Sequence, residues 1–166
     1  MNSRPVAWWG VMMLVAAEAT LFGCLIGTYF YLRFSTPHWP PDGIAKPSIT
    51  VPVVLALVLA ASVVPLRLGN RLGIALALVL QAGYFAYAVH DFADRLRSFT
   101  PQTDAYGSIY YVLLGADHAH VAVGILFDLW LLARYRVLAL RVVTIYWIAV
   151  AVLTLAVTGT LLSARA

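Results

Sequence analysis

Residues 7–32 read AWWGVMMLVAAEATLFGCLIGTYFYL, an apolar run with a single acidic residue, Glu18, near its middle. A helix that crosses a bilayer needs about 20 mostly apolar residues, and this run is long enough. Trp8 and Trp9 stand near its start and Tyr31 near its end. Aromatic residues favour the two faces of a bilayer in this way. The run therefore predicts a transmembrane helix.

Four further apolar stretches follow, at about residues 49–66, 72–89, 109–132 and 142–162. Only Arg67 to Arg71 separate the first two of these, with Gly69 and Asn70 as turn residues. One long broken helix would put two arginines in mid-membrane at high cost, so we expect a tight helical hairpin there. The sequence predicts an all-α fold, an integral membrane bundle of five transmembrane helices that forms one transmembrane domain over residues 1–166.

The composition agrees with a membrane protein. Hydrophobic residues make up 63% of the chain and charged residues 11%, whereas a soluble domain has about 45–50% and about 25%. The single cysteine, Cys24, excludes a disulfide within the chain and a site built from several thiolates. The net charge of +4 is small and its arginines are scattered, which does not favour nucleic acid as a partner. We expect a multi-pass protein of the cell (inner) membrane.

The arginines also suggest an orientation. If the amino terminus is cytoplasmic, the two tight turns on the inside are purely basic, with Arg67, Arg71, Arg134 and Arg136. The longer outside loops then mix basic with acidic residues. Cytoplasmic loops are enriched in Lys and Arg. We therefore predict that the amino terminus is cytoplasmic and the carboxyl terminus is outside.

Glu18 is the most informative single residue. It lies ten residues after Trp8, a rise of roughly 15 Å and half of the hydrocarbon thickness. A charged side chain there costs about 2.5–3.5 kcal/mol unless it is protonated or paired. Glu18 should therefore face other helices. Two roles remain open, a structural hydrogen-bonding group and a carrier of protons.

The fourth apolar stretch contains further polar residues. At about 100° per residue, one face collects Asp117, His120, Val121, Gly124 and Asp128. His118 points elsewhere. If the first and fourth helices cross the membrane in opposite directions, His120 lies near the depth of Glu18. These two side chains can then pair between the helices. Residues two apart on a helix do not face one site, and we therefore predict no metal ligands here.

Small residues indicate where helices approach closely. Gly23 and Gly27 form a G-x-x-x-G pattern, and Gly115 with Ala119 forms a second pair at the same spacing. Such pairs permit close contact between helices in membranes. We predict helix packing at Gly23, Gly27, Gly115 and Gly124.

The sequence lacks a phosphate-binding glycine loop, a nucleophile elbow and a haem-attachment motif. It therefore predicts no catalytic, cofactor-binding or metal-binding residues in this chain. An independent proton or small-solute transporter that uses Glu18 and the Asp117/His120 face remains an alternative. The intramembrane ionisable groups are sparse for a continuous path, and the halves do not resemble each other as transporter repeats do.

Three stretches together resemble the cytochrome c oxidase subunit III family. The stretch from Ala16 to Phe22, continuing to Arg33, is similar to that family's glutamate-bearing helix. The stretch of residues 105–115 is similar to a second signature of that family, and so are His120, Val121 and Gly124, which follow it. Tyr146 and Trp147 resemble the start of the family's last helix. Glu18 and His120 match residues of the family pattern, whereas Asp117 and His118 depart from it.

The resemblance implies the short five-helix form of subunit III, without the first two helices of the commonest form. It implies a non-catalytic subunit of a haem-copper terminal oxidase in aerobic respiration, which stabilises catalytic subunit I and supports proton uptake. Haem and copper then belong to partner subunits, and phospholipid binds at the surface. The electron donor is left open, so a quinol oxidase is a close alternative and a nitric oxide reductase accessory subunit another. An extended catalytic subunit is one source for the two absent helices.

Overall fold

The structure is a computed structural model that describes residues 6–46 and 48–165. The regular secondary structure of this part of the chain is entirely helical, with no strand. Five of its helical segments are long and apolar enough to cross a membrane, which confirms the predicted number of spans. The helices are α1 (Val6–Ser35), α2 (Thr50–Ala61), η1 (Pro65–Leu68), α3 (Arg71–Arg95), α4 (Ala105–Ala133), α5 (Val137–Leu162) and η2 (Ser163–Arg165).

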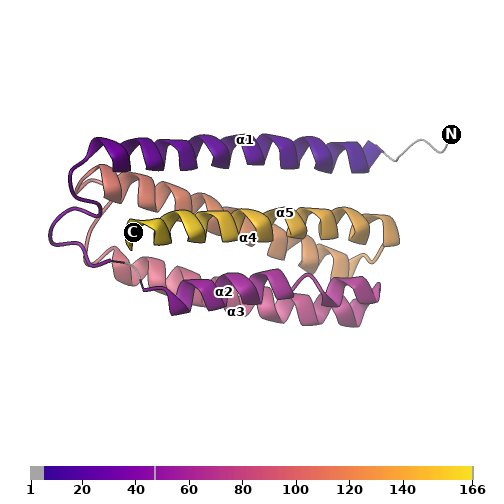
Figure 1. Ribbon diagram of the computed structural model, residues 1–166. Coiled ribbons are helices and arrows are strands. Elements are labelled where there is room, and N and C mark those ends of the chain that lie inside the picture. Colours follow the sequence, from indigo (N-terminus) through magenta and orange to yellow (C-terminus); the bar gives the residue numbers. More distant parts are fainter. Residues whose placement is uncertain (1–5, 47, 166) are drawn as a thin grey trace.

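The helices run side by side in three layers (Figure 1). Helices α4 and α5 pack together in the middle, α1 covers one side of them, and the α2–α3 hairpin covers the other. Because the number of spans is odd, the start of α1 and the end of α5 lie at opposite ends of the bundle. We call the end with residues 62–70 and 134–136 the short-turn end. The end with residues 36–46 and 96–104 is the long-loop end.

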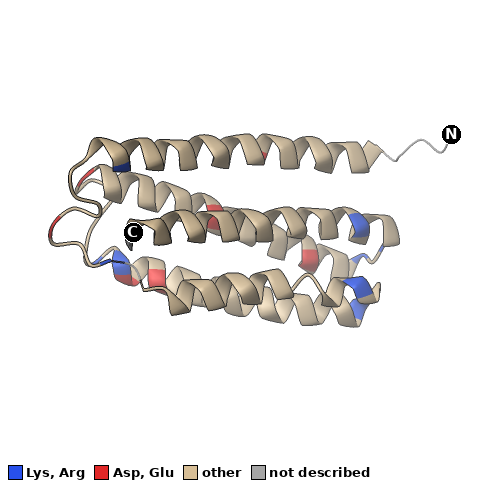
Figure 2. Ribbon diagram, in the orientation of Figure 1, with Lys and Arg blue, Asp and Glu red and all other residues tan. Residues whose placement is uncertain are grey.

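The charged residues are distributed unevenly along the length of the bundle (Figure 2). Among the described residues, lysine and arginine lie at or near the two ends of the bundle, whereas several acidic residues lie along its middle. Cations at the ends can reach water or lipid headgroups. The acidic residues in the middle need partners within the protein.

The hairpin between α2 and α3 is confirmed, but its first helix is interrupted. Residues 49–66 were expected to form one helix, whereas α2 ends at Ala61 and η1 begins at Pro65. Proline lacks an N–H and its ring clashes with the carbonyl four residues earlier, so the α-helix cannot continue through it. Gly69 then adopts a left-handed conformation with φ 66°. The Asn70 side chain accepts a hydrogen bond from Gly73 N–H at 2.8 Å and caps α3.

The remaining helices are longer than the apolar stretches that predict them. Helix α3 continues past residue 89 through polar residues, where Arg95 Nε donates to Asp91 at 2.7 Å one turn away. Helix α4 begins at Ala105, because the Asp104 carboxylate accepts a hydrogen bond from Gly107 N–H at 2.7 Å. Apolarity alone marks the part of a helix that lies in lipid, and the caps and ion pairs extend the helix beyond it.

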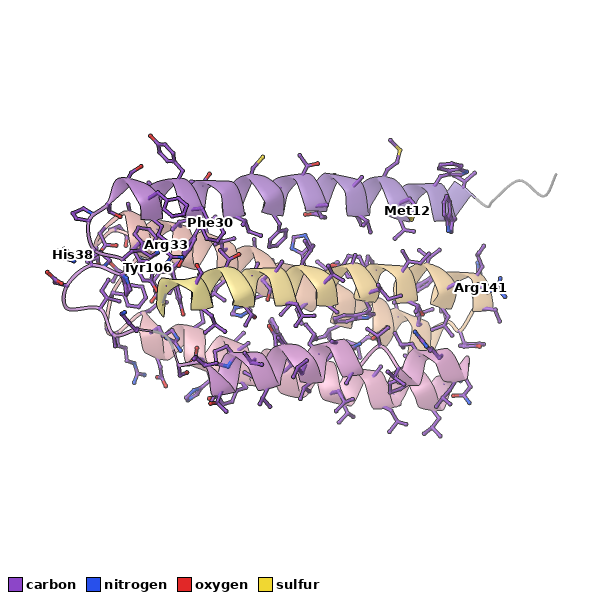
Figure 3. All side chains as sticks on the ribbon, in the orientation of Figure 1. Met12, Phe30, Arg33, His38, Tyr106 and Arg141 are labelled. Atoms are coloured by element: carbon purple, nitrogen blue, oxygen red, sulfur yellow. The ribbon has the colours of Figure 1, made fainter. Side chains whose placement is uncertain are left out.

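The long-loop end is closed by an aromatic cluster, with Phe30 and Tyr106 labelled there in Figure 3. The Trp39 ring meets Tyr29 and Tyr106 edge to face, with centroids 5.3 and 5.0 Å apart. The Tyr111 hydroxyl donates to the Phe99 carbonyl at 2.9 Å. These contacts bind both long loops to the helices.

Candidate intramembrane polar site

Glu18 of α1 and His120 of α4 form an interhelical pair. The Oε2 atom of Glu18 lies 2.8 Å from Nε2 of His120, and the side chains are 21% and 18% exposed. The other ring nitrogen, Nδ1, lies 2.6 Å from the Ala116 carbonyl oxygen. The Tyr146 hydroxyl of α5 donates to the His120 carbonyl at 2.8 Å. Helices α1 and α4 therefore hold the imidazole, and α5 holds the backbone carbonyl of the same residue. The pairing of Glu18 with His120 that the sequence allows is present in the structure.

The surroundings of His120 determine where its protons can be. A carbonyl oxygen only accepts, so Nδ1 carries a proton in its contact with Ala116. Nε2 then faces the Glu18 carboxyl, and one further proton can reside on either partner. The pair is neutral overall as an acid beside an imidazole and also as a carboxylate beside an imidazolium. Both forms avoid placing a net charge in the membrane.

The Glu18–His120 pair borders apolar space on the surface between α1 and the α4–α5 layer. A cavity of about 260 Å³ is lined by Leu14, Glu18, Ala119, His120, Val123 and Tyr146. An apolar groove of about 620 Å³ adjoins it toward the short-turn end and shares Leu14 and Tyr146. The pair therefore lies at the inner end of a groove that suits an apolar chain.

Asp117 lies one turn before His120 on α4, but its side chain has other hydrogen-bond partners. Its side chain is 1% exposed, and it accepts hydrogen bonds from the Thr154 hydroxyl of α5 at 2.6 Å and the Tyr84 hydroxyl of α3 at 3.2 Å. The shared face predicted for Asp117 and His120 does not bring their side chains to one site. Because α4 is surrounded by neighbours, a small angular offset points Asp117 toward α3 and α5 and His120 toward α1.

A third polar cluster was not predicted. Asp128 of α4 is fully buried beside Gln81 of α3 and Trp147 of α5, both also fully buried. Among the described residues, their side-chain polar atoms form no hydrogen bond of ordinary geometry. Sequence reasoning placed Asp128 on the inner face but missed Gln81, Tyr84 and Thr154. A polar side chain inside an apolar span was the available signal for these three residues.

The four glycines differ in what surrounds them. A Cβ on Gly124 would lie 2.5 Å from the Trp147 ring, so this glycine is needed for the contact between α4 and α5. At Gly23, Gly27 and Gly115, a Cβ would meet none of the described residues within 4 Å. Gly23 and Gly27 are exposed on α1. Among the described residues, no neighbouring helix therefore packs closely on the G-x-x-x-G pattern.

The described residues contain no group of three or more His, Cys, Asp or Glu side chains placed to hold a metal ion. His118, which the sequence directed away from the inner face, packs edge to face on Phe92 of α3 with centroids 5.6 Å apart. Residues 6–46 and 48–165 thus contain two fully buried carboxyls, Asp117 and Asp128, apart from the half-buried Glu18–His120 pair.

No family model matches the chain. Curated relatives nevertheless align with most of it. Cytochrome c oxidase subunit 3 of Thermostichus vulcanus is 24% identical over 138 residues, which are 76% of this chain and 67% of that protein. The Bacillus subtilis protein of the same name is 25% identical over 158 residues, 83% of this chain and 76% of the relative.

Two further relatives complete the comparison. Quinol oxidase subunit 3 of Bacillus spizizenii is 25% identical over 138 residues, covering 76% of this chain and 68% of the relative. For cytochrome c oxidase subunit 3 of Synechocystis sp., 26% identical over 140 residues, the aligned part is only 58% of the relative's length. The chain is therefore similar to the third subunits of cytochrome c and quinol oxidases.

Proposed function

We propose that the chain is a non-catalytic subunit III of a haem-copper terminal oxidase, working in aerobic respiratory electron transport in the cell (inner) membrane. The observation that carries this proposal is the alignment of 76–83% of the chain with the third subunits of oxidases. Five helices suited to a membrane support it. The oxidation of the donor and the reduction of oxygen take place in partner subunits that hold haem and copper.

The exposed face of α1 is the proposed contact with catalytic subunit I. Only 11% of the most apolar window of α1 is buried within the chain, against 39% for α5. Gly23 and Gly27 lie on this helix with open space around them. A neighbouring helix can approach such a face closely, since no Cβ stands in its way. In this proposal the contact stabilises the catalytic subunit.

The Glu18–His120 pair and the groove beside it support two finer parts of the proposal. The pair can hold one proton without adding net charge to the membrane, which suits a role in sustaining proton uptake by the oxidase. The apolar groove of about 620 Å³ is lined by α1, α4 and α5 residues and suits a phospholipid acyl chain.

In this proposal, other subunits of the complex determine which electron donor is used. Relatives of both kinds, cytochrome c oxidase and quinol oxidase, align with the chain at similar identity. We propose cytochrome c as the donor of the complex, with quinol as the close alternative. Turnover of the purified complex with each reductant distinguishes these two.

Co-purification tests the proposal. The tagged chain, extracted with a mild detergent, should migrate in native gels together with haem absorbance and with a larger polytopic subunit. Extraction with a harsh detergent is the control, because it should separate the tag from the haem band. Migration of the chain alone under mild conditions, without haem, would contradict the assignment.

A further inference from the structure

A small cavity, mostly apolar but with several polar groups in its lining, lies at the long-loop end among α2, α3, α4 and α5 and apart from the Glu18–His120 pair. Its volume is about 70 Å³. An ordered water needs about 10–15 Å³ of such space, so the cavity has room for several waters and is too small for a lipid chain. Its lining includes Asp91, Arg95, His118 and Thr158. These groups offer hydrogen bonds of both kinds, as a hydrated cavity requires.

The cavity lies between an ion pair near the surface of the bundle and a tyrosine that contacts a buried carboxyl. At its outer side is the Arg95–Asp91 ion pair, whose side chains are 24% and 39% exposed. At its inner side is Tyr84, which lines the cavity and donates a hydrogen bond to Asp117 at 3.2 Å. Asp117 itself is 1% exposed. A chain of polar groups thus runs from the long-loop end through the cavity to Asp117.

We propose that Asp117 is a proton-binding site that exchanges protons with the aqueous phase at the long-loop end, through water in this cavity and the Tyr84 hydroxyl. In the uptake direction, a hydronium ion in the cavity gives a proton to the Tyr84 oxygen as the Tyr84 hydroxyl proton passes to the Asp117 carboxylate. The products are water, an unchanged tyrosine and a neutral carboxylic acid. Release follows the same steps in reverse.

The groups around Asp117 are consistent with exchange on one side only. Tyr84 of α3 and Thr154 of α5 donate to its two oxygens. The nearest other titratable groups are His118, which lines the cavity, and His120, which is paired with Glu18 of α1. From α2, the cavity lining is apolar. Toward the short-turn end, the neighbouring core of α3, α4 and α5 is apolar apart from the Asp128 cluster, and this core separates Asp117 from the opposite end.

Infrared spectroscopy of the full chain in lipid discs tests the proposal. In acidic buffer, the neutral carboxyl band of Asp117 is identified by its loss in the Asp117→Asn variant. On transfer to D₂O, this band should shift faster than the slow opening of the helices allows. A band that fails to shift until the backbone amides of α4 exchange would show a sealed carboxyl and overturn the proposal.

Two variants locate the route. Thr158→Leu fills the cavity and Tyr84→Phe removes the linking hydroxyl, and each should slow the shift of the Asp117 band by at least about tenfold, toward the rate set by local opening. Val152→Leu is the matched control, since Val152 is an exposed residue of the same helix, and it should exchange at the parent rate. An unchanged rate in either Thr158→Leu or Tyr84→Phe would overturn the proposal. These readouts need no haem, so they are independent of the oxidase assignment.

Discussion

At Glu18, the membrane interior limits which side chains the structure tolerates. The carboxyl has one close polar partner among the described residues, the His120 ring at 2.8 Å, and apolar space on its other side. Glutamine has the same length and both donates and accepts hydrogen bonds. Alanine would leave Nε2 of His120 facing an apolar cavity.

We therefore expect Glu18→Gln to keep the fold and Glu18→Ala to lose about 1–3 kcal/mol of stability, the cost of an unsatisfied buried polar group. Unfolding of the purified chain by titration with a denaturing detergent, followed by helical circular dichroism, measures the difference. His120→Ala in the Glu18→Ala background should cost little more than either change alone. If Glu18→Ala is as stable as Glu18→Gln, the pair contributes nothing to the fold.

Gly124 and Gly115 form a matched pair for a packing test. A Cβ at Gly124 would overlap the rigid Trp147 ring, whereas a Cβ at Gly115 meets no described residue within 4 Å. Gly124→Ala should therefore destabilise the chain by about 1–3 kcal/mol through overpacking. Gly115→Ala should be neutral or stabilising by about 0.5–1 kcal/mol, because alanine favours the helix. Equal stabilities for the two variants would show that Trp147 moves freely, contrary to its burial.

For single residues, the sequence predicted the contact that depends on depth in the bilayer. It missed the contacts that depend on how each helix is rotated about its axis. Glu18 and His120 could be matched because the rise per residue places both near the middle of the bilayer. The partners of Asp117 could not be found in this way, since Tyr84 and Thr154 stand among apolar residues whose direction depends on how each helix is rotated. That rotation is set by packing between helices.

Among the elements, α4 has a start that a side-chain cap and a close backbone contact define. The Asp104 carboxylate accepts from Gly107 N–H at 2.7 Å, and a Cβ on Gly107 would collide with the Thr100 carbonyl. Asp104→Ala should cost about 1 kcal/mol, the usual effect of losing an N-cap. Asp104→Asn should retain most of the stability. Thermal unfolding of the two variants checks the difference, and a full loss in Asp104→Asn would mean that the charge, rather than the cap, is what matters.

Helix α1 should behave differently alone and in a complex. Gly23→Leu and Gly27→Leu add bulk where the described chain leaves open space, so the isolated chain should keep its stability. If catalytic subunit I packs on this face, the same changes should reduce the yield of the haem-containing complex at least several-fold. Leucine at Gly83 of α3, an exposed glycine that also has open space around its Cβ but lies in the hairpin on the other side of the bundle, is the control. An undiminished yield would place the Gly23–Gly27 face against lipid.

The existence of each helix was predictable, and the ends were less so. Long apolar runs determine that a span exists. The Gly69–Asn70 turn was visible because glycine and asparagine suit its left-handed and capping positions. The break before Pro65 was also present in the sequence, but an apolar count does not register it, since Pro65 stands between the apolar residues Val64 and Leu66. The extension of α3 to Arg95 depends on side-chain pairing with Asp91 rather than on hydropathy.

For the whole molecule, the odd number of spans makes orientation testable. The two chain ends lie at opposite ends of the bundle (Figure 1). With the short-turn end in the cytoplasm, a carboxyl-terminal tag should react with an impermeant reagent in intact spheroplasts, and an amino-terminal tag only after permeabilisation. The reverse result would invert the bundle without altering its fold. Labelling of both tags from the same side would contradict five spans.

The number of spans follows from the sequence, whereas their arrangement does not. Nothing in the α1 sequence shows that it covers α4 and α5 and stays apart from the α2–α3 hairpin. The apolar residues of a membrane helix surround it on all sides, so they give no stripe that identifies the inner face. The polar residues give that information instead, and they did so for Glu18, His120 and Asp117.

The order of partners along the chain has a consequence for biogenesis. Glu18, Gln81 and Tyr84 all precede α4, so their helices have left the ribosome before Asp117, His120 and Asp128 reach the translocon. Each polar group of α4 can therefore enter the bilayer toward a waiting neighbour. Helix α5, synthesised last, supplies Thr154 and Trp147 and closes the remaining side. A nascent chain halted after α4 should hold its fourth helix less firmly in the membrane than the finished chain does.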